Sequence, residues 1–143
     1  MADLYLKQLE IGPMQNFQYL VGDAKTKEVA LVDPAWDVEE ILKVAEEDGL
    51  KIQAILISHI HYDHVNALDR ALKATNAKVY VHKEEARELG VPKSYSMPSE
   101  NGTQVKLGDI TIELIHTPGH TVGSQCFFVR DKLISGDTLF IGT

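Results

Sequence analysis

Four residues with metal-ligating side chains lie within six positions of the sequence: His59, His61, Asp63 and His64. They directly follow the apolar run 54–57, which is too short for a helix and contains β-branched residues, so it predicts a buried strand. Imidazole and carboxylate groups are good ligands for zinc, iron or manganese, and the lack of cysteine in this segment argues against a purely structural zinc site. These residue types at the exit of a core strand predict a metal centre rather than a polar loop with incidental histidines.

The spacing within this segment bears on the number of metal ions. In extended backbone His59 and His61 point to the same side, because side chains alternate along a strand. Asp63 and His64 come where the chain should turn into the next helix, so they can face a neighbouring point. The spacing therefore fits two adjacent metal positions better than one.

The bulk composition describes one domain of ordinary globular character. The chain has 143 residues and a net charge of −7, and a nucleic-acid partner would need a basic stripe instead. No apolar stretch is long enough to cross a membrane, and the first residues are not typical of a secretion signal. The single cysteine, Cys126, excludes an internal disulfide. We therefore expect a cytoplasmic protein with neither a nucleic-acid nor a membrane partner.

The first part of the chain predicts an antiparallel meander followed by a helix. Residues 4–11 alternate between apolar and polar side chains, and 17–21 and 29–32 flank a polar turn, so these three segments predict strands. Asp37 and Glu40 have the spacing of an N-cap and its capping-box partner. The helix predicted after Asp37 would then cover one face of the sheet.

The middle of the chain predicts a different pattern. After the histidine segment, residues 65–75 carry apolar side chains at helical spacing, 78–81 predict a strand, and 83–89 predict a short charged helix. Together with the strand at 54–57, this alternation of strands and helices is typical of an α/β fold in which helices cover a sheet.

The last part of the chain predicts two hairpins. Residues 105–107 and 110–115 flank a Gly-Asp turn, and 125–129 and 133–135 flank an Arg-Asp turn. Cys126 lies among apolar residues of one of these strands and is expected to be buried rather than reactive.

Two further residues with ligand chemistry follow strands in this part of the chain. His120 comes shortly after the strand at 110–115, and Asp137 comes shortly after the strand at 133–135. His59 stands in the same relation to the strand at 54–57. If these strands lie in neighbouring sheets, their ends converge on one edge of the fold.

Three motifs occur in a fixed order: residues 59–64, residues 117–121 and residues 135–140. Together with the strand end at 32–34, they resemble the metallo-β-lactamase superfamily, and specifically its glyoxalase II-like branch of hydroxyacylglutathione hydrolases and persulfide dioxygenases. The resemblance covers essentially the whole chain. It implies a four-layer αβ/βα sandwich with metal ions at one edge of the two sheets.

The resemblance also implies a role for each polar residue of the motifs. It gives two groups of metal ligands and one carboxylate that bridges the two ions: His59, His61 and His120 for the first ion, Asp63 and His64 for the second, and Asp137 as the bridge. Asp33 would orient a ligand imidazole from behind, although a simple turn-forming role is the alternative reading of an Asp-Pro strand end. We expect His82 and His116 to be structural, with His82 otherwise exposed.

The chemistry that such a site supports is hydrolysis. A divalent ion lowers the pKa of a bound water toward ~7 and polarises a carbonyl oxygen. With two divalent ions (zinc, iron or manganese), a bridging hydroxide would attack the acyl carbon, the ions would stabilise the oxyanion, and Asp63 would position or receive the proton. We therefore expect a metal-dependent hydrolase acting on a small thiol-derived substrate, a thioester of the S-acylglutathione type.

Two alternatives stay open at this point. In a persulfide dioxygenase, a single Fe(II) would be held by His59, His120 and Asp137, a two-histidine, one-carboxylate set with open positions for oxygen and thiolate. In the second alternative, the chain is an inactive fragment. Metal identity and number separate the first alternative from the hydrolase, and stability in solution tests the second.

The chain departs from the family pattern after residue 137. Members of the family continue with further strands, helices and a last histidine ligand, whereas this sequence stops at Thr143 with every histidine already placed. We therefore expect residues 1–143 to be a metallo-β-lactamase-like domain without its C-terminal portion. That portion, or another chain, would complete it, because a lone half-sandwich leaves sheet edges and apolar faces exposed.

Overall fold

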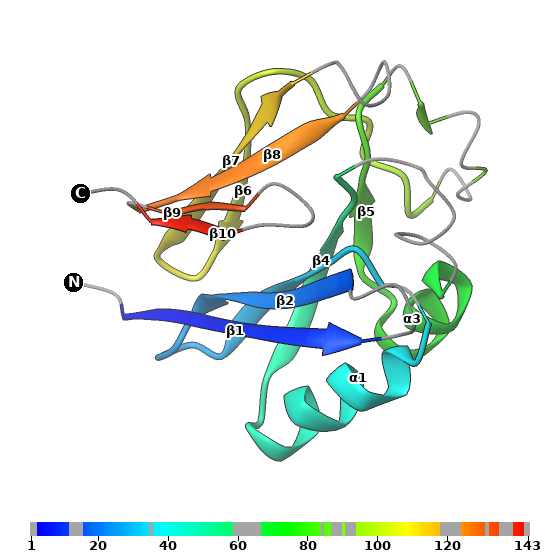
Figure 1. The fold of residues 1–143 in the computed structure, drawn as a ribbon, viewed down its shortest axis with the longest axis vertical. Coiled ribbons are helices and arrows are strands. Elements are labelled where there is room, and N and C mark those ends of the chain that lie inside the picture. Colours follow the sequence, from blue (N-terminus) through cyan, green and yellow to red (C-terminus); the bar gives the residue numbers. More distant parts are fainter. Residues whose placement is uncertain are drawn as a thin grey trace.

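The computed structural model contains two five-stranded sheets packed face to face, with helices on the outer side of the first sheet (Figure 1). The structure describes residues 3–11, 16–34, 36–58, 67–83, 85–86, 90, 94–117, 124–130, 132–134 and 139–141. Within these residues the layers are helix, sheet and sheet. No helix in the described ranges is long and apolar enough to cross a membrane.

The first sheet holds the N-terminal strands in sequence order. They are β1 (Leu4–Ile11), β2 (Asn16–Asp23), β3 (Glu28–Val32), β4 (Lys51–Leu56) and β5 (Lys78–Tyr80). The strands β1, β2 and β3 pair antiparallel, as the predicted meander requires, and β3, β4 and β5 pair parallel. Parallel pairing brings the carboxyl ends of β3, β4 and β5 to the same edge of the sheet.

Two helices make the connections that parallel pairing needs. Helix α1 (Val38–Glu47) joins β3 to β4, and α3 (Leu68–Thr75) precedes β5. The helices bury apolar side chains such as Ile41 and Ala71 against Leu31 of the sheet. The helix predicted over 65–75 is confirmed from residue 68 onward, while residues 65–66 lie outside the described part of the chain.

The start of α1 differs from the prediction. Asp37 occupies the N-cap position, but its side chain makes no capping hydrogen bond. Its backbone has φ −86° and ψ 68°, away from the extended conformation that lets a capping side chain turn back onto the helix. The Glu40 N–H instead donates to the Asp37 carbonyl oxygen at 3.1 Å. The capping box predicted for Asp37 and Glu40 is therefore wrong.

The second sheet is built from consecutive antiparallel strands. They are β6 (Thr103–Leu107), β7 (Ile110–His116), β8 (Gln125–Val129), β9 (Lys132–Ile134) and β10 (Leu139–Ile141), ordered β10-β9-β8-β7-β6. Both predicted hairpins are confirmed, whereas β10 was not predicted. The predicted helix at 83–89 falls largely on residues outside the described ranges.

Alternating side chains divide the core into two clusters. Leu20 and Ile55 face the helices, while Tyr19 and Leu56 face the second sheet, as expected from the two-residue period of a strand. The opposing side of this second cluster comes from the second sheet, with residues such as Phe127. Both faces of the first sheet are therefore covered, one by the helices and the other by the second sheet.

The second sheet corrects one expectation from the sequence. We expected exposed apolar faces, yet the large hydrophobic side chains with substantial exposure in the described residues are Met97 and Phe128, at 42% and 41%. The physical reason is that β6 and β7 alternate strictly, with Ile112 buried and Glu113 exposed. A sheet of this kind tolerates solvent on its outer face.

A buried carboxylate joins the two sheets at the end of the sandwich where β7 begins. Asp23, at the end of β2, is buried, and its Oδ2 accepts the Asp109 N–H of the β6–β7 turn at 2.8 Å. Its Oδ1 accepts the Lys25 N–H at 2.8 Å. Gly108 allows this close approach, since a Cβ there would lie 2.5 Å from Asp23 Oδ2. The hydrogen bond from Asp109 is the main reason that the pKa of Asp23 is lowered from its usual 3.8.

We expect Asp23→Asn to remove an acid-sensitive part of the stability. A carboxylate whose pKa is lower in the folded state stabilises the fold above its unfolded pKa of about 4, and this stabilisation is lost as pH falls through the lower folded pKa. Wild type should therefore be more stable than Asp23→Asn at pH 7, and the difference should shrink below about pH 4. Denaturant unfolding at stepped pH measures this. Asp109→Asn, which keeps the backbone donor, is the matched control, and an equal loss at every pH would contradict the account.

Candidate metal centre

The structure describes the residues that flank the predicted metal ligands, but not the ligands themselves. The six predicted ligands lie outside the described residues: His59, His61, Asp63, His64, His120 and Asp137. Among the residues that are described, no group of three or more histidine, cysteine, aspartate or glutamate side chains could hold a metal ion. The ligand set therefore stays a prediction. The described residues show where the segments that carry these ligands begin and end.

Asp33 fixes the residue that precedes the histidine segment. Asp33 is 1% exposed; its Oδ1 accepts the Ser58 N–H at 2.7 Å and its Oδ2 accepts the Ser58 hydroxyl at 2.6 Å. The Asp33 N–H in turn donates to the Leu56 carbonyl oxygen at 2.9 Å. Because β3 and β4 are parallel, both strand ends lie at this edge. The carboxylate thus holds the backbone immediately before His59.

The backbone at Asp33 also turns at this point. Its φ is +53°, the left-handed region that aspartate and asparagine tolerate better than most residues. Both sequence interpretations of Asp33, as a turn residue and as a support for the site, thus have a physical basis. Its contact with a ligand imidazole stays a prediction, since those residues lie outside the described ranges.

We expect substitutions of Asp33 to lower the free energy of unfolding. Asp33→Ala would leave the buried Ser58 N–H and hydroxyl without their charged acceptor and should lower the free energy of unfolding by about 2–4 kcal/mol. Asp33→Asn keeps one acceptor and the left-handed backbone, so it should cost about 1 kcal/mol. Denaturant unfolding of both variants measures the difference. Equal stability of Asp33→Ala and wild type would show that this contact does not hold the strand ends together.

A second junction ties the His120 segment to the same edge. The Thr117 N–H donates to the Ser124 carbonyl oxygen at 2.8 Å, so the two residues that flank 118–123 are paired. The Gln125 N–H donates to the Ser58 carbonyl oxygen, also at 2.8 Å. This bond joins the first sheet to the second directly before His59. The convergence of strand ends expected from the sequence is confirmed for these two segments.

The third ligand-bearing segment begins on a neighbouring strand. Ile134, the last residue of β9, pairs with Phe127 of β8 and with Leu139 of β10. Because β9 runs antiparallel to β8, it heads toward the end of β8 at which Gln125 stands. The described end of β9 therefore points toward the same junction, and residues 135–138, which include the predicted bridging carboxylate, follow it in the sequence.

The donor set suits divalent ions. Its four imidazoles and two carboxylates are borderline to hard ligands that zinc, iron and manganese accept, and it contains no thiolate. The described residues that flank the three donor-bearing segments lie toward one edge of the two sheets. The residues present therefore fit the metal ions that the sequence predicts.

Two further histidines stack on each other beside this edge. The ring centroids of His82 and His116 are 3.8 Å apart and their planes differ by 19°. His82 is 2% exposed, and the His116 N–H donates to Asn101 Oδ1 at 3.0 Å. These contacts agree with the structural role predicted for both histidines and correct the expectation that His82 could be exposed. They pack the exit of β5 against the exit of β7.

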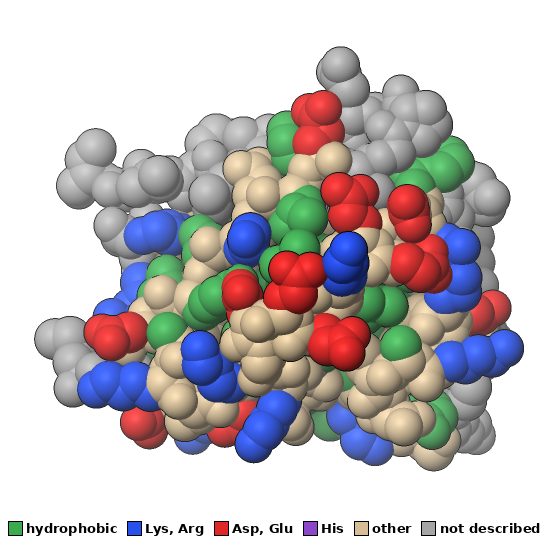
Figure 2. Space-filling view, turned by 90° about the horizontal axis from the view of Figure 1, so that it is seen from below, with side chains coloured by type: hydrophobic (Ala, Val, Ile, Leu, Met, Phe, Trp, Pro, Cys, Tyr) green, Lys and Arg blue, Asp and Glu red, His purple; other side chains and the backbone are tan. Residues whose placement is uncertain are grey.

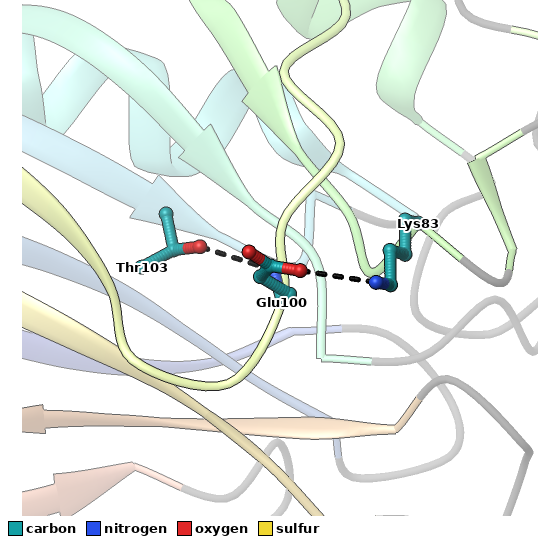
Figure 3. A network of polar contacts seen from close by, with 3 residues as sticks. All are labelled: Lys83, Glu100 and Thr103. Carbon is teal, nitrogen blue, oxygen red and sulfur yellow. Dashed lines mark hydrogen bonds and ion pairs between the residues drawn. The ribbon is translucent and has the colours of Figure 1, made fainter.

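A polar network continues from this pair along the surface (Figure 3). Lys83 Nζ lies 3.0 Å from Glu100 Oε2, and the Glu100 N–H donates to Thr103 Oγ1 at 3.0 Å. The hydrogen bond from Lys83 lowers the pKa of Glu100. Both side chains are exposed, so the ion pair contributes little to stability. It links the exit of β5 to the start of β6.

Cys126 has the environment that the sequence predicts. Its side chain is buried in β8, and its Sγ lies 3.4 Å from Thr117 Oγ1. The thiol is therefore part of the packing between the strands that flank 118–123.

One of the open pockets among the described residues lies away from the metal edge. A cavity of about 470 Å³ is lined by residues of α1, the end of α3 and the first residues of β4, including Leu42 and Lys51. Ser58 stands past the opposite end of β4. The predicted metal centre therefore does not coincide with this cavity.

Viewed from below, the molecule shows interspersed acidic and basic side chains (Figure 2).

The comparison with protein families decides the membership of the chain. The model of the metallo-beta-lactamase superfamily matches residues 11–143. This chain belongs to that superfamily. The family is one of metallo-hydrolases, and the predicted family and fold are thereby confirmed.

Two curated relatives are similar to most of this chain. The chain is 35% identical over 133 residues to the cytoplasmic isozyme of hydroxyacylglutathione hydrolase from Saccharomyces cerevisiae, covering 87% of this chain and 48% of the yeast protein. It is 30% identical over 125 residues to the probable polyketide biosynthesis zinc-dependent hydrolase PksB from Bacillus subtilis, covering 87% of this chain and 56% of that protein. The chain thus spans about half the length of the curated relatives it matches.

A solved structure adds a likeness in three dimensions. The structure of TTHA1623 in a di-iron-bound form superimposes with a TM-score of 0.73 at 29% identity, covering 96% of this chain and 76% of that one. One relative is thus named for zinc and another binds two irons. These likenesses support divalent metal ions at the site and leave the choice of metal open.

Proposed function

We propose that this chain carries the metal-binding part of a hydrolase that acts on a small thioester of the S-acylglutathione type. The observation that carries the proposal is the junction at Ser58, which is held by Asp33 from one side and by Gln125 from the other. This junction supports a site at which the ligand-bearing segments meet. The 35% identity to the yeast hydroxyacylglutathione hydrolase supports the substrate class.

As the family resemblance implies, His59, His61 and His120 would hold one ion, Asp63 and His64 would hold the other, and Asp137 would serve both. When bound, the ions supply an activated water at neutral pH and polarise the carbonyl of the substrate. The carboxylate of Asp63 receives the proton that the attacking water loses. Asp33 and Ser58 keep the start of the histidine segment in place during this step.

A thioester suits this set of residues. Attack forms the C–O bond at the acyl carbon, and the C–S bond then breaks with its electron pair on sulfur. A thiol has a pKa of about 8.5, so the thiolate leaves near neutral pH without a strong general acid. Only one proton acceptor, Asp63, is then required of the protein. An amide would in addition need a proton donor for its nitrogen.

The proposal extends to the surroundings of the chain. Because the chain spans about half of its curated relatives, we propose that the remaining part of the domain, or another chain, supplies the contacts that grip the thiol portion of the substrate. We also propose a cytoplasmic location, like that of the similar cytoplasmic isozyme from yeast.

Hydrolysis of S-lactoylglutathione tests the proposed function. The chain should release free thiol from this thioester, treatment with a chelator should abolish the release, and added zinc, iron or manganese should restore it. The corresponding amide and a β-lactam should react far more slowly. Hydrolysis that persists after complete metal removal would contradict the proposal, as would a preference for the amide.

A further inference from the structure

The side chain of Gln125 bridges the two sheets beneath the predicted metal centre. Gln125 is the first residue of β8 and is 2% exposed. Its Nε2 donates to the Ile57 carbonyl oxygen at 2.8 Å and lies 3.4 Å from the Tyr80 carbonyl oxygen. Its Oε1 accepts the Ser99 hydroxyl at 2.8 Å. One amide thus contacts the exits of β4 and β5 and the segment that precedes β6.

These contacts use the particular chemistry of an amide. A glutamine side chain offers two N–H donors and one carbonyl acceptor, and here donors and acceptor all have partners. A buried amide is costly unless its hydrogen bonds are made. A hydrophobic side chain of the same length could fill the space but could not hold the two carbonyl groups. The bridge therefore depends on the functional group as well as on volume.

The position of Gln125 relates it to both ligand-bearing segments. Its side chain holds Ile57, two residues before His59, and its backbone holds Ser58. In the sequence Gln125 follows His120 by five residues. The residue therefore links the start of one ligand segment to the end of the other.

We propose that Gln125 is a positioning residue that sets the separation between residues 59–66 and 118–123, and with it the affinity and geometry of the first metal site. The inference rests on the proposed function, which takes the ligands of the first ion from both segments. Metal–ligand distances are fixed to within about 0.2 Å, so a small shift between the segments lowers the affinity of the first site for its ion. Asp63 and His64 come from one segment, so the second ion depends less on the bridge.

Cobalt binding tests the role of Gln125. Gln125→Met keeps the length and removes the hydrogen bonds, and Gln125→Glu keeps an acceptor but loses both donors. Titration of the metal-free chain with Co²⁺, followed by its visible absorption, reports affinity and geometry without any activity. We expect Gln125→Met to weaken the tighter cobalt site about 10- to 100-fold and to alter its absorption band. Gln125→Glu places a buried carboxylate against the two carbonyl oxygens and should weaken this site at least as much as Gln125→Met.

The matched control is Phe127→Leu, a fully buried residue of the same strand that packs between the sheets. It lowers stability and leaves the hydrogen bonds of Gln125 in place, so its cobalt affinity should stay within about twofold of wild type. Wild-type affinity and spectrum in a folded Gln125→Met would overturn the inference alone. A wild-type chain that binds no cobalt would overturn both the proposed metal centre and this inference.

A second variant covers the case in which Gln125→Met does not fold. Ser99→Ala removes only the partner of the amide oxygen and leaves the Gln125 N–H donors in place. We then expect a smaller loss of cobalt affinity, about 3- to 10-fold, with the fold retained. Unchanged affinity in Ser99→Ala would overturn the role of the bridge in that case.

Discussion

Replacing His120 with alanine is expected to empty the first metal site and to lower thioester hydrolysis by about 10³-fold or more. Polarisation of the carbonyl by a metal ion contributes several kcal/mol to transition-state stabilisation, and each 1.36 kcal/mol corresponds to about a factor of ten in rate. His120 lies in the segment between the paired residues Thr117 and Ser124. In the proposed site, its loss would remove the ligand of the first ion that comes from the segment after β7.

Metal content and kcat/KM of His120→Ala, measured together, check this prediction. His116→Ala is the matched control, because it removes another histidine, four residues earlier in the chain, whose ring packs on His82. We expect the control to keep its metal even if its stability falls. Wild-type metal content and activity in His120→Ala would contradict both the hydrolase and the dioxygenase interpretations.

Replacing His64 with alanine is expected to separate the two enzyme classes. In a two-metal hydrolase His64 holds the second ion, so the variant should lose about one metal per chain and about 100-fold in kcat/KM, the equivalent of roughly 2.7 kcal/mol. In a mononuclear iron dioxygenase the ligands are His59, His120 and Asp137, and the same change should be mild.

The two readouts for His64→Ala are thioester hydrolysis and oxygen uptake with glutathione persulfide. Loss of hydrolysis together with one metal supports the two-metal hydrolase. Undiminished oxygen uptake with one iron per chain would instead assign the chain to the dioxygenase class. His116→Ala again serves as the control for removal of a histidine outside the predicted ligand set.

Much of the fold follows from local sequence pattern. The alternation over 4–11 and the Gly-Asp turn before Ile110 predict their strands closely, because a two-residue period has only one way to bury an apolar face. Strand β10 was not predicted: it has three residues, and a run that short carries too little pattern. The capping box at Asp37 failed because a backbone angle, rather than residue identity, decides whether the side chain reaches the helix.

The contacts that organise the site could not be read from local pattern. Asp33 and Ser58 are 25 residues apart, and Gln125 and Ile57 are 68 apart. The first bond depends on the parallel pairing of β3 with β4 and the second on how the two sheets pack, and no short window of sequence encodes either. Gln125 in particular carries no signal in the sequence: a lone glutamine at the start of a strand is ordinarily a surface residue.

The ligand motifs, in contrast to these contacts, can be recognised from the sequence alone. The spacing of His59, His61, Asp63 and His64 after a core strand predicts a metal centre from chemistry alone, and the family match supports it. The described residues contribute what the motifs do not contain, namely the hydrogen bonds that bring their flanking residues to one edge. The ligand motifs and the hydrogen bonds between their flanking residues are independent arguments for the same site.

The amount and identity of metal per chain test the central claim most directly. Elemental analysis of the 143-residue chain, purified without added metal or chelator, should find about two zinc, iron or manganese ions per chain if the proposed two-metal centre is present. A chain that is folded and contains no metal, and that takes up none when zinc, iron and manganese are supplied, would contradict the account.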